Sequence, residues 1–235
     1  MQTARCVCYT AMVAALVGCG GESSGPTASY AFAPPPMSSQ RTYAVTDVNP
    51  TSTSVNTVIQ TVTKVNPDGS FSYHEDVPPG IPINGPNYQP GDYTDDSSGH
   101  LLTFTPIVGF PCTATPRGPG PIFPVTVGEK WQWMYGYLCA PPGSLVPVPL
   151  YTETGSVADI ESITVPAGTF AAVKLQSTIT WQTGLCNGGC TETLTLWLSV
   201  ANGELVKSTA NYNYGTSGTL TTTALLSETR ELVTP

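Results

Sequence analysis

Short runs rich in Val, Ile, Thr and aromatic residues alternate with Pro- and Gly-rich stretches from Arg41 to the end of the chain. Runs of this kind are typical of β-strands. The pattern predicts strands over residues 42–47, 54–66, 71–75, 101–108, 132–138, 151–160, 161–165, 171–181, 191–200, 204–214 and 219–233. Helical spacing of apolar residues over three turns is confined to the first 18 residues and to 224–232. The predicted fold class is therefore all-β with antiparallel strands.

Two short sequence motifs predict tight turns between these strands. In Asn66-Pro67-Asp68-Gly69, Pro fixes its own φ and Gly can take a positive φ. Asn202-Gly203 is a strong hairpin signal between two β-rich runs. By contrast, residues 77–99 are dominated by Pro, Gly, Asn, Asp and Ser, which predicts a long surface excursion. A second Pro/Gly-rich loop is predicted around Cys112.

The N-terminus has the pattern of a secretory signal peptide. An apolar run over residues 6–17 follows the single charge of Arg5, and the run is too short to span a bilayer permanently. Its end, Leu16-Val17-Gly18-Cys19, resembles the lipobox of bacterial lipoproteins at all four positions. The resemblance implies cleavage before Cys19 and acylation of that residue. The alternative is an ordinary secretory signal with a chance cysteine.

These features divide the chain into three predicted parts. Residues 1–18 are the signal peptide, 19–40 are the lipidated cysteine and a disordered, Pro/Gly/Ser-rich tether, and 41–235 form a single β-domain. Gly20 lacks the Asp that retains enteric lipoproteins at the inner membrane, so we expect an outer-membrane anchor with the domain in the periplasm or at the cell surface.

The charge of the chain argues against binding to nucleic acids and to anionic lipid headgroups. Without Arg5, seven of the eight basic residues remain against sixteen acidic ones, a net charge of −9. The basic residues are scattered singly, whereas nucleic acids and anionic lipid headgroups bind Lys/Arg clusters. We therefore expect the lipid anchor to provide the membrane contact and expect no nucleic-acid partner.

Four cysteines remain after the signal peptide and Cys19 are set aside: Cys112, Cys139, Cys186 and Cys190. An even number in an exported protein predicts two disulfides, with three possible pairings. The glycines of Cys186-Asn-Gly-Gly-Cys190 favour a bridge across that short loop, which leaves Cys112 with Cys139. A zinc site is the alternative, although Cys-x3-Cys with two distant cysteines fits zinc-ligand spacing poorly.

The second half of the chain carries a further resemblance. Its segments are Phe123-Pro-x-x-x-Gly128-x-x-Trp131, then Val165-Pro-Ala-Gly-Thr-Phe170 with Lys174, then Gly203-Glu-Leu-Val206-Lys207, and finally Glu231-Leu232-Val233. They are similar to a family of Gram-negative envelope lipoproteins, most of which have no assigned function. Some members have been likened to lipoprotein carriers, which implies a curved antiparallel sheet, an incomplete β-barrel or a sandwich, around an apolar cavity. The resemblance covers the half from residue 121 to 235 and does not reach 41–115.

Four large side chains are candidates for the lining of such a cavity: Trp131, Trp133, Phe170 and Trp181. Trp131 and Trp133 are two residues apart and therefore lie on one face of a strand. The simpler interpretation of these residues is an ordinary apolar core. Gly128 and Gly168 are expected at positive φ or at close approaches of the backbone.

No catalytic constellation is evident, so we expect no enzyme activity, no metal and no cofactor. His74 and His100 lie near acidic residues, but we expect both to be exposed and unpaired rather than metal ligands. The acidic stretch 92–99 lacks the spacing of an EF-hand and is expected to be a solvated loop. The carboxylates Glu153, Asp159, Glu161, Glu192 and Glu204 could supply a glycosidase pair, but their strand contexts suggest that they face water.

Two functional hypotheses follow. In the first, the lipoprotein binds or hands on a hydrophobic small molecule in a pocket of the curved sheet. In the second, it is a structural or interaction module that contacts another envelope protein through its Pro/Gly-rich loops, residues 77–99 and 112–139.

Overall fold

A computed structural model describes residues 28–77, 91–106, 111–139, 150–181, 189–214 and 225–235. The side chains of Pro106 and Cys139 are excepted. The predicted signal peptide, Cys19 and Cys186 lie outside these residues.

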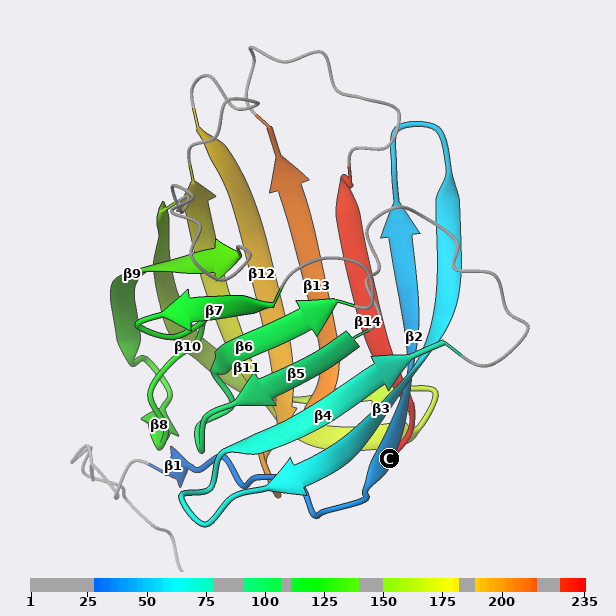
Figure 1. The fold of residues 1–235 in the computed structure, drawn as a ribbon, viewed down its shortest axis with the longest axis vertical. Helices are drawn as coiled ribbons and strands as arrows, with labels where there is room; N and C mark the ends of the chain where they lie inside the picture. The colour runs from blue at the N-terminus through cyan, green and yellow to red at the C-terminus, as the bar shows by residue number, and fades with distance from the viewer. Residues whose placement is uncertain (1–27, 78–90, 107–110, 140–149, 182–188, 215–224) are drawn as a thin grey trace, which may run out of the picture.

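Twelve antiparallel strands form a closed barrel (Figure 1) in the order β10-β11-β12-β13-β14-β2-β3-β4-β5-β6-β7-β9, and β9 pairs with β10 to complete the ring. The strands are β2 (Gln40–Val48), β3 (Thr53–Val65), β4 (Phe71–Asp76), β5 (Gly91–Asp95), β6 (Leu101–Pro106), β7 (Cys112–Thr115), β9 (Lys130–Cys139), β10 (Leu150–Val165), β11 (Gly168–Trp181), β12 (Cys190–Ser199), β13 (Leu205–Asn213) and β14 (Ser227–Thr234). The predicted all-β class is confirmed. The ring is closed, however, where an incomplete barrel or a sandwich was expected.

The turns predicted from sequence connect neighbouring strands as expected. Gly69 has a φ of 85° and its N–H donates to the Asn66 carbonyl at 3.0 Å, which closes the β3–β4 hairpin. Gly203 has a φ of 73° in the β12–β13 hairpin. Gly128 and Gly168 also have positive φ, at 88° and 134°.

Closure of the ring depends on two short strands that the sequence pattern did not predict. β5 lies within the stretch expected to be a surface excursion, and β7 lies within the loop expected around Cys112. Both are short and interrupted by polar residues, so they carry little strand signal of their own. Hydrogen bonding to their neighbours determines their conformation, because β5 is paired between β4 and β6 and β7 between β6 and β9. In addition, the runs 151–160 and 161–165 form one strand, β10, with a bulge after Val157.

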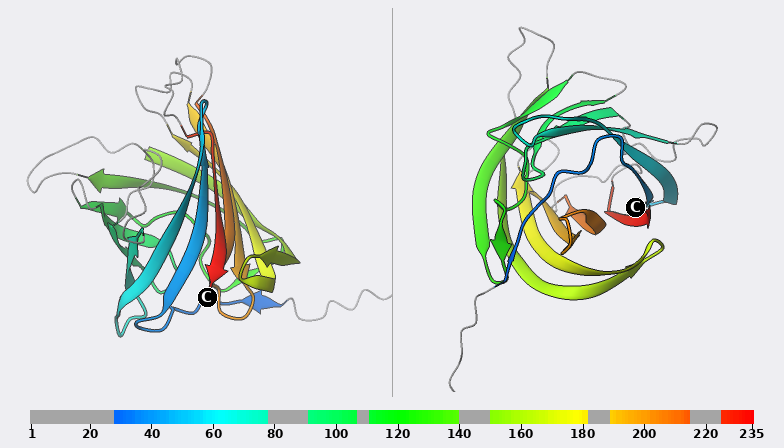
Figure 2. Two further views of the ribbon diagram at one scale, coloured as in Figure 1. Left: turned by 90° about the vertical axis from the view of Figure 1, so that its right-hand side faces the viewer. Right: turned by 90° about the horizontal axis from the view of Figure 1, so that it is seen from below.

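Residues 28–39, which we call the strap, cross the base of the barrel (Figure 2, right). The strap begins with β1 (Ser29–Tyr30), which pairs with β8 (Val125–Thr126) in a separate two-stranded sheet. The Ala33 N–H then donates to the Asn202 carbonyl at 3.1 Å, and the Ser38 N–H donates to the Val62 carbonyl at 3.0 Å. The distal part of the predicted disordered tether is therefore an ordered part of the domain.

The inner wall changes character along the strands. Every second residue points inward in a strand, and near the strap these positions are apolar. Two buried clusters occupy this end: Tyr43, Val45, Val58, Val165, Val206 and Leu232 in one, and Val125, Val157, Val173, Leu175 and Leu198 in the other. Farther along the same strands the inward positions become acidic.

Candidate functional site

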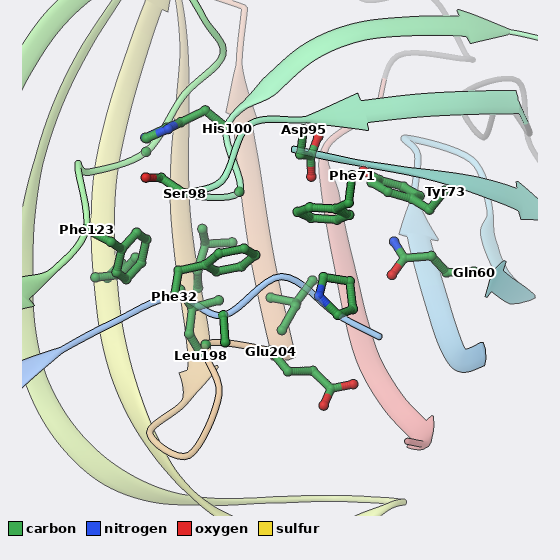
Figure 3. A pocket seen from close by; sticks show the side chains of 18 of the residues that line it. Phe32, Gln60, Phe71, Tyr73, Asp95, Ser98, His100, Phe123, Leu198 and Glu204 are labelled. Atoms are coloured by element: carbon green, nitrogen blue, oxygen red, sulfur yellow. The ribbon is translucent and has the colours of Figure 1, made fainter. Parts of the chain in front are cut away.

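A cavity of about 210 Å³ lies inside the base of the barrel, between the strap and the inner wall (Figure 3). Its volume exceeds that of an apolar cavity that holds benzene, about 150 Å³, and is below the usual 300–1,000 Å³ of drug-sized pockets. The larger apolar side chains that line it come from seven separate segments: Phe32, Tyr43, Phe71, Tyr73, Phe123, Leu175, Leu196, Leu198 and Leu205. The space suits one ring or a short alkyl chain.

Phe32 of the strap forms one wall of this cavity. Its ring centroid lies 5.9 Å from that of Phe71 and 5.8 Å from that of Phe123. Two glycines leave room for it: a Cβ on Gly99 would meet the Phe32 ring at 2.9 Å, and a Cβ on Gly203 would meet its Cα at 2.9 Å. The strap is therefore fitted against two hairpin turns, and it separates the cavity from the base of the barrel.

The opposite side of the cavity carries two ion pairs. Arg230 on β14 donates to both carboxylate oxygens of Glu75 on β4, at 2.7 and 3.4 Å, across the interior of the barrel. Arg41 pairs with Glu204 in the same region. Burial opposes the charge of Arg230, yet the carboxylates of Glu75 and Glu228 raise its pKa above the usual value. Each pair combines one guanidinium with one carboxylate and is neutral overall, so this side of the cavity is not strongly anionic or cationic.

A hairpin turn between β5 and β6 supplies the third side. The Asp96 carboxylate accepts hydrogen bonds from the N–H groups of Ser98 (2.8 Å) and His100 (3.0 Å), and its other oxygen lies 3.0 Å from His100 Nδ1. These contacts hold the turn in one conformation. They leave two buried atoms without a hydrogen-bond partner, Asp95 Oδ1 and His100 Nε2. Burial, followed by the charges of Asp96 and Glu75, raises the pKa of Asp95 well above its usual range.

An acidic belt lines the barrel beyond the cavity. We define it as Asp47, Glu153, Glu192 and Glu228, which face inward on β2, β10, β12 and β14. Asp47 is directly opposite Glu228 in the β2–β14 ladder and has no partner for either carboxylate oxygen. Burial, then Glu228, raises the pKa of Asp47 to about 6. Burial, then Glu228 and Glu153, raises that of Glu192 to about 7.

An aromatic ladder runs along the wall from the cavity toward the far end of the barrel. Consecutive ring centroids are 5.2 to 6.1 Å apart. Its members are Phe71, Tyr73, Tyr93, Phe104, Tyr137, Tyr151 and Trp181. Such rings present a continuous apolar surface with polar hydroxyl tips.

The four aromatic residues predicted to line one pocket lie in four different places. Trp131 lines a separate cavity of about 30 Å³ and packs against the backbone of Gly155, where a Cβ would approach its ring to 2.2 Å. Phe170 packs on the apolar cluster around Leu232. Trp181 ends the aromatic ladder, 5.8 Å from Tyr151. None of them lines the larger cavity.

Trp133 instead belongs to a polar cluster under the turn that carries His100. Its Nε1–H donates to Glu153 Oε2 at 3.1 Å, and the Arg117 guanidinium lies 4.4 Å from its ring centroid. Glu153 also accepts from the Gly120 N–H at 2.9 Å and is 1% exposed. The expectation that Glu153 faces water is therefore wrong, because its position on the pleat points into the barrel.

The expectation that both histidines are exposed and unpaired is also wrong. His100 is 1% exposed and contacts Asp96, while His74 on the outside lies 2.8 Å from Asp92. They contact different carboxylates, and the described residues contain no group of three His, Cys, Asp or Glu side chains placed to hold a metal ion. Within the same residues no helix has the length and apolarity needed to cross a membrane.

One residue of the cavity, Arg230, has a sequence signal that the sequence interpretation did not use. Arg230 is two residues from Leu232, so both lie on one face of a strand, and a charged residue at an inward position indicates a buried ion pair. Phe32 lies in the segment that was expected to be a disordered tether. Its partners, Phe71 and Phe123, are distant in sequence, and no local pattern identifies them.

The structure describes only some of the cysteines that are predicted to form disulfides. The β7–β9 ladder places Cys112 directly opposite Cys139, the pairing expected from sequence, and Cys112 is 4% exposed. Cys190 is fully buried at the start of β12. The pairing itself stays a prediction.

Known structures resemble the fold as a whole. No protein-family profile and no curated protein matches the sequence. A Bacteroides fragilis protein described as exported and as having a YmcC-like fold aligns with a TM-score of 0.51 and 13% identity, over 87% of this chain and 98% of that chain. The chain has a YmcC-like fold. The Escherichia coli protein YmcC, described as a hypothetical lipoprotein, gives a TM-score of 0.49 (11% identity; 85% and 88% covered), and a Parabacteroides distasonis protein described as a lipoprotein gives 0.41 (16%; 87% and 98%).

Proposed function

We propose that this protein is an exported, lipid-anchored protein of the bacterial envelope, held in the outer membrane, that binds a small apolar molecule in the cavity at the base of its barrel. The apolar lining of that cavity carries the proposal, because apolar cavities of this size take up apolar ligands. Export and anchoring rest on the pattern of residues 1–19, and the description of the B. fragilis protein as exported agrees with them.

The strap links the predicted lipid anchor to the cavity that is proposed to bind the ligand. It is the first described segment after the predicted lipid anchor, and its Phe32 forms a wall of the cavity. A ligand that enters from the base must therefore displace the strap or pass beside it. We do not expect catalysis, a metal or a cofactor to be required for binding.

Native mass spectrometry of the chain from Gly20 to Pro235, exported to the periplasm and purified without detergent, tests the proposal. This chain keeps every described residue. We expect a co-purifying mass that organic solvent extracts and that Leu196→Phe, which fills the cavity, removes. Leu150→Phe is the matched control, because Leu150 is 64% exposed on the outside. A clean apo mass that also takes up no added benzene would contradict the proposal.

A second candidate function is contact with another envelope protein. Met134, Leu138 and Leu150 are 60%, 44% and 64% exposed and lie on the outer face of the adjacent strands β9 and β10. Neighbouring exposed apolar residues are typical of interaction surfaces. A photo-crosslinking residue at position 134 should capture one abundant envelope protein in cells, and the same residue at the exposed position 159 should not. Equal labelling from both positions would argue against a partner there.

A further inference from the structure

A group of buried oxygen atoms lies at the hairpin between β2 and β3. Along β2 the buried positions alternate through Val45, Asp47 and Asn49, so the last two side chains point to the same side as the core. Asp47 is 1% exposed and Asn49 is 7% exposed. Figure 1 shows this hairpin at the end of the barrel opposite β1 and the strap. The group is therefore separate from the cavity at the base.

Four oxygen atoms at this hairpin are buried and have no hydrogen-bond partner among the described residues. They are both carboxylate oxygens of Asp47, Oδ1 of Asn49 and Oγ of Ser54. Such atoms are costly, and proteins usually satisfy them. Seven side-chain atoms of the described residues are in this condition, and four of the seven lie in this one hairpin. A single ligand shared by the four would account for all of them.

The register of the sheet places these atoms close together. Asp47 is directly opposite Ser54 in the β2–β3 ladder and directly opposite Glu228 in the β14–β2 ladder. Opposite residues of antiparallel strands have Cβ atoms about 4.5–5.5 Å apart. The three side chains therefore form one row on the inner face, and Asn49 is the next inward residue after Asp47. We call Asp47, Asn49, Ser54 and Glu228 the oxygen cluster.

The charges of the oxygen cluster are not balanced within the protein. Asp47 and Glu228 face each other, and burial followed by the charge of Glu228 raises the pKa of Asp47 to about 6. Arg230 is the cation whose charge acts on Asp47, but its guanidinium already donates to both carboxylate oxygens of Glu75. Water can satisfy neutral oxygens, but it leaves two facing carboxylates uncompensated. The oxygen cluster therefore favours a cation.

We propose that the oxygen cluster binds one Ca²⁺ ion, which joins the ends of β14, β2 and β3. Ca²⁺ takes six to eight oxygen ligands at about 2.3–2.6 Å, and carboxylates, amide carbonyls and water are usual among them. Mg²⁺ is smaller and keeps several of its own waters, so it suits a buried oxygen set less well. The described residues contain no group of three His, Cys, Asp or Glu side chains for a metal, and this cluster differs because half of its ligands are neutral.

Thermal unfolding of the chain from Gly20 to Pro235 tests the proposal. The chain is freed of metal with a chelator and followed by circular dichroism at about pH 7.5, where most Asp47 carboxyl groups are ionised. We expect about 5 mM CaCl₂ to raise Tm by about 5–8 °C, the shift that follows from a Kd near 10⁻⁴ M. The same concentration of MgCl₂ should give less than about half of that shift. Titration calorimetry should show one Ca²⁺ bound per chain.

Asp47→Asn is the decisive variant, because it keeps the shape of the side chain and removes its charge. We expect it to weaken Ca²⁺ binding by at least about 30-fold and to reduce the Tm shift to less than about 2 °C. Without metal the variant should be at least as stable as the unaltered chain, so a lost shift is not a folding defect. Glu192→Gln is the matched control. It removes another charge of the acidic belt, outside the oxygen cluster, and should keep most of the shift.

Three results would overturn the proposal. The first is the absence of both a Tm shift and a heat of binding with Ca²⁺. The second is an equal shift with Mg²⁺, which would indicate general screening of the acidic interior. The third is an equal loss of the shift in Asp47→Asn and Glu192→Gln, which would show that Ca²⁺ does not depend on the oxygen cluster. None of these results bears on ligand binding in the cavity at the base, because no residue of the oxygen cluster lines that cavity.

Discussion

The base of the barrel and its far end have the same strands but opposite chemistry. On β14 the inward positions go from Leu232 through Arg230 to Glu228, and on β2 they go from Tyr43 through Val45 to Asp47. At the base, side chains are buried against one another and sealed by the strap. Toward the acidic belt, carboxyl groups face one another with few cations. Within four residues of one strand, the inward positions therefore change from an ordinary apolar core to carboxyl groups that are costly to bury.

The two regions should differ in how they respond to mutation. At the base, removing a side chain removes packing and should reduce stability. In the acidic belt, removing a charge removes repulsion and desolvation cost, and should increase it. The Arg230–Glu75 ion pair lies between the two regions. It is the strongest test of how burial affects charge, because removing one partner leaves the other charge buried without compensation.

Loss of Arg230 should have the largest effect. Arg230→Met leaves the Glu75 carboxylate buried without its partner, and we expect the free energy of unfolding to fall by about 3–5 kcal/mol. Urea denaturation measures the change. The double variant Arg230→Met/Glu75→Leu should recover most of the loss, since no uncompensated charge remains.

The matched control for that prediction is Lys207→Met. Lys207 pairs with Glu231 at 2.6 Å, but the two side chains are 24% and 31% exposed, so we expect a loss under about 1 kcal/mol. Equal losses from Arg230→Met and Lys207→Met would show that burial does not distinguish the two ion pairs.

Loss of Phe32 should have the second largest effect and tests whether the strap belongs to the domain. Phe32→Ala removes the contacts with Phe71 and Phe123, and we expect a loss of about 2–3 kcal/mol in the free energy of unfolding because Phe32 is only partly buried. Met37→Ala is the control in the same segment. Met37 is 61% exposed, and its truncation should change stability by less than about 0.5 kcal/mol. If Phe32→Ala behaves like Met37→Ala, the strap does not contribute to stability.

Neutralising Asp47 should have the smallest effect, with the opposite sign. Its pKa is about 6 in the folded protein against about 3.9 in an unfolded chain, so the folded state binds the proton more tightly. The corresponding stability is complete below about pH 4 and is lost as pH rises through about 6. Asp47→Asn does not undergo that loss.

The Asn variant should therefore be more stable than the unaltered protein by about 1–2 kcal/mol at pH 8 and nearly equal to it at pH 4, measured by urea denaturation at each pH. Asp159→Asn, at an exposed position on β10, should show no such pH dependence. A variant of Asp47 that is less stable at pH 8 would mean that the carboxylate has a stabilising partner.

The parts of the fold that could be predicted from the sequence are those that produce a local pattern of residues. Long strands such as those over 54–66 and 171–181 were evident, because alternation and β-branched residues extend over many positions. β5 and β7 were not, because their conformation is determined by the strands on either side. The sequence singled out four large aromatic residues as a possible pocket lining, and only the barrel decides that they occupy four separate sites.

By itself, the sequence determined the all-β class and the positions of the tight turns at Gly69 and Gly203, since each depends on neighbours in the chain, and residues 1–19 predict export and anchoring in the same local way. Tertiary structure decided that the ring closes, that the strap packs across its base, and that Asp95 and His100 face an apolar cavity with unpaired atoms. The physical reason is range: turns and strand periodicity are local properties, whereas burial is determined by which distant segments cover a side chain. The Phe32 ring, enclosed by Phe71 and Phe123, shows that difference most directly.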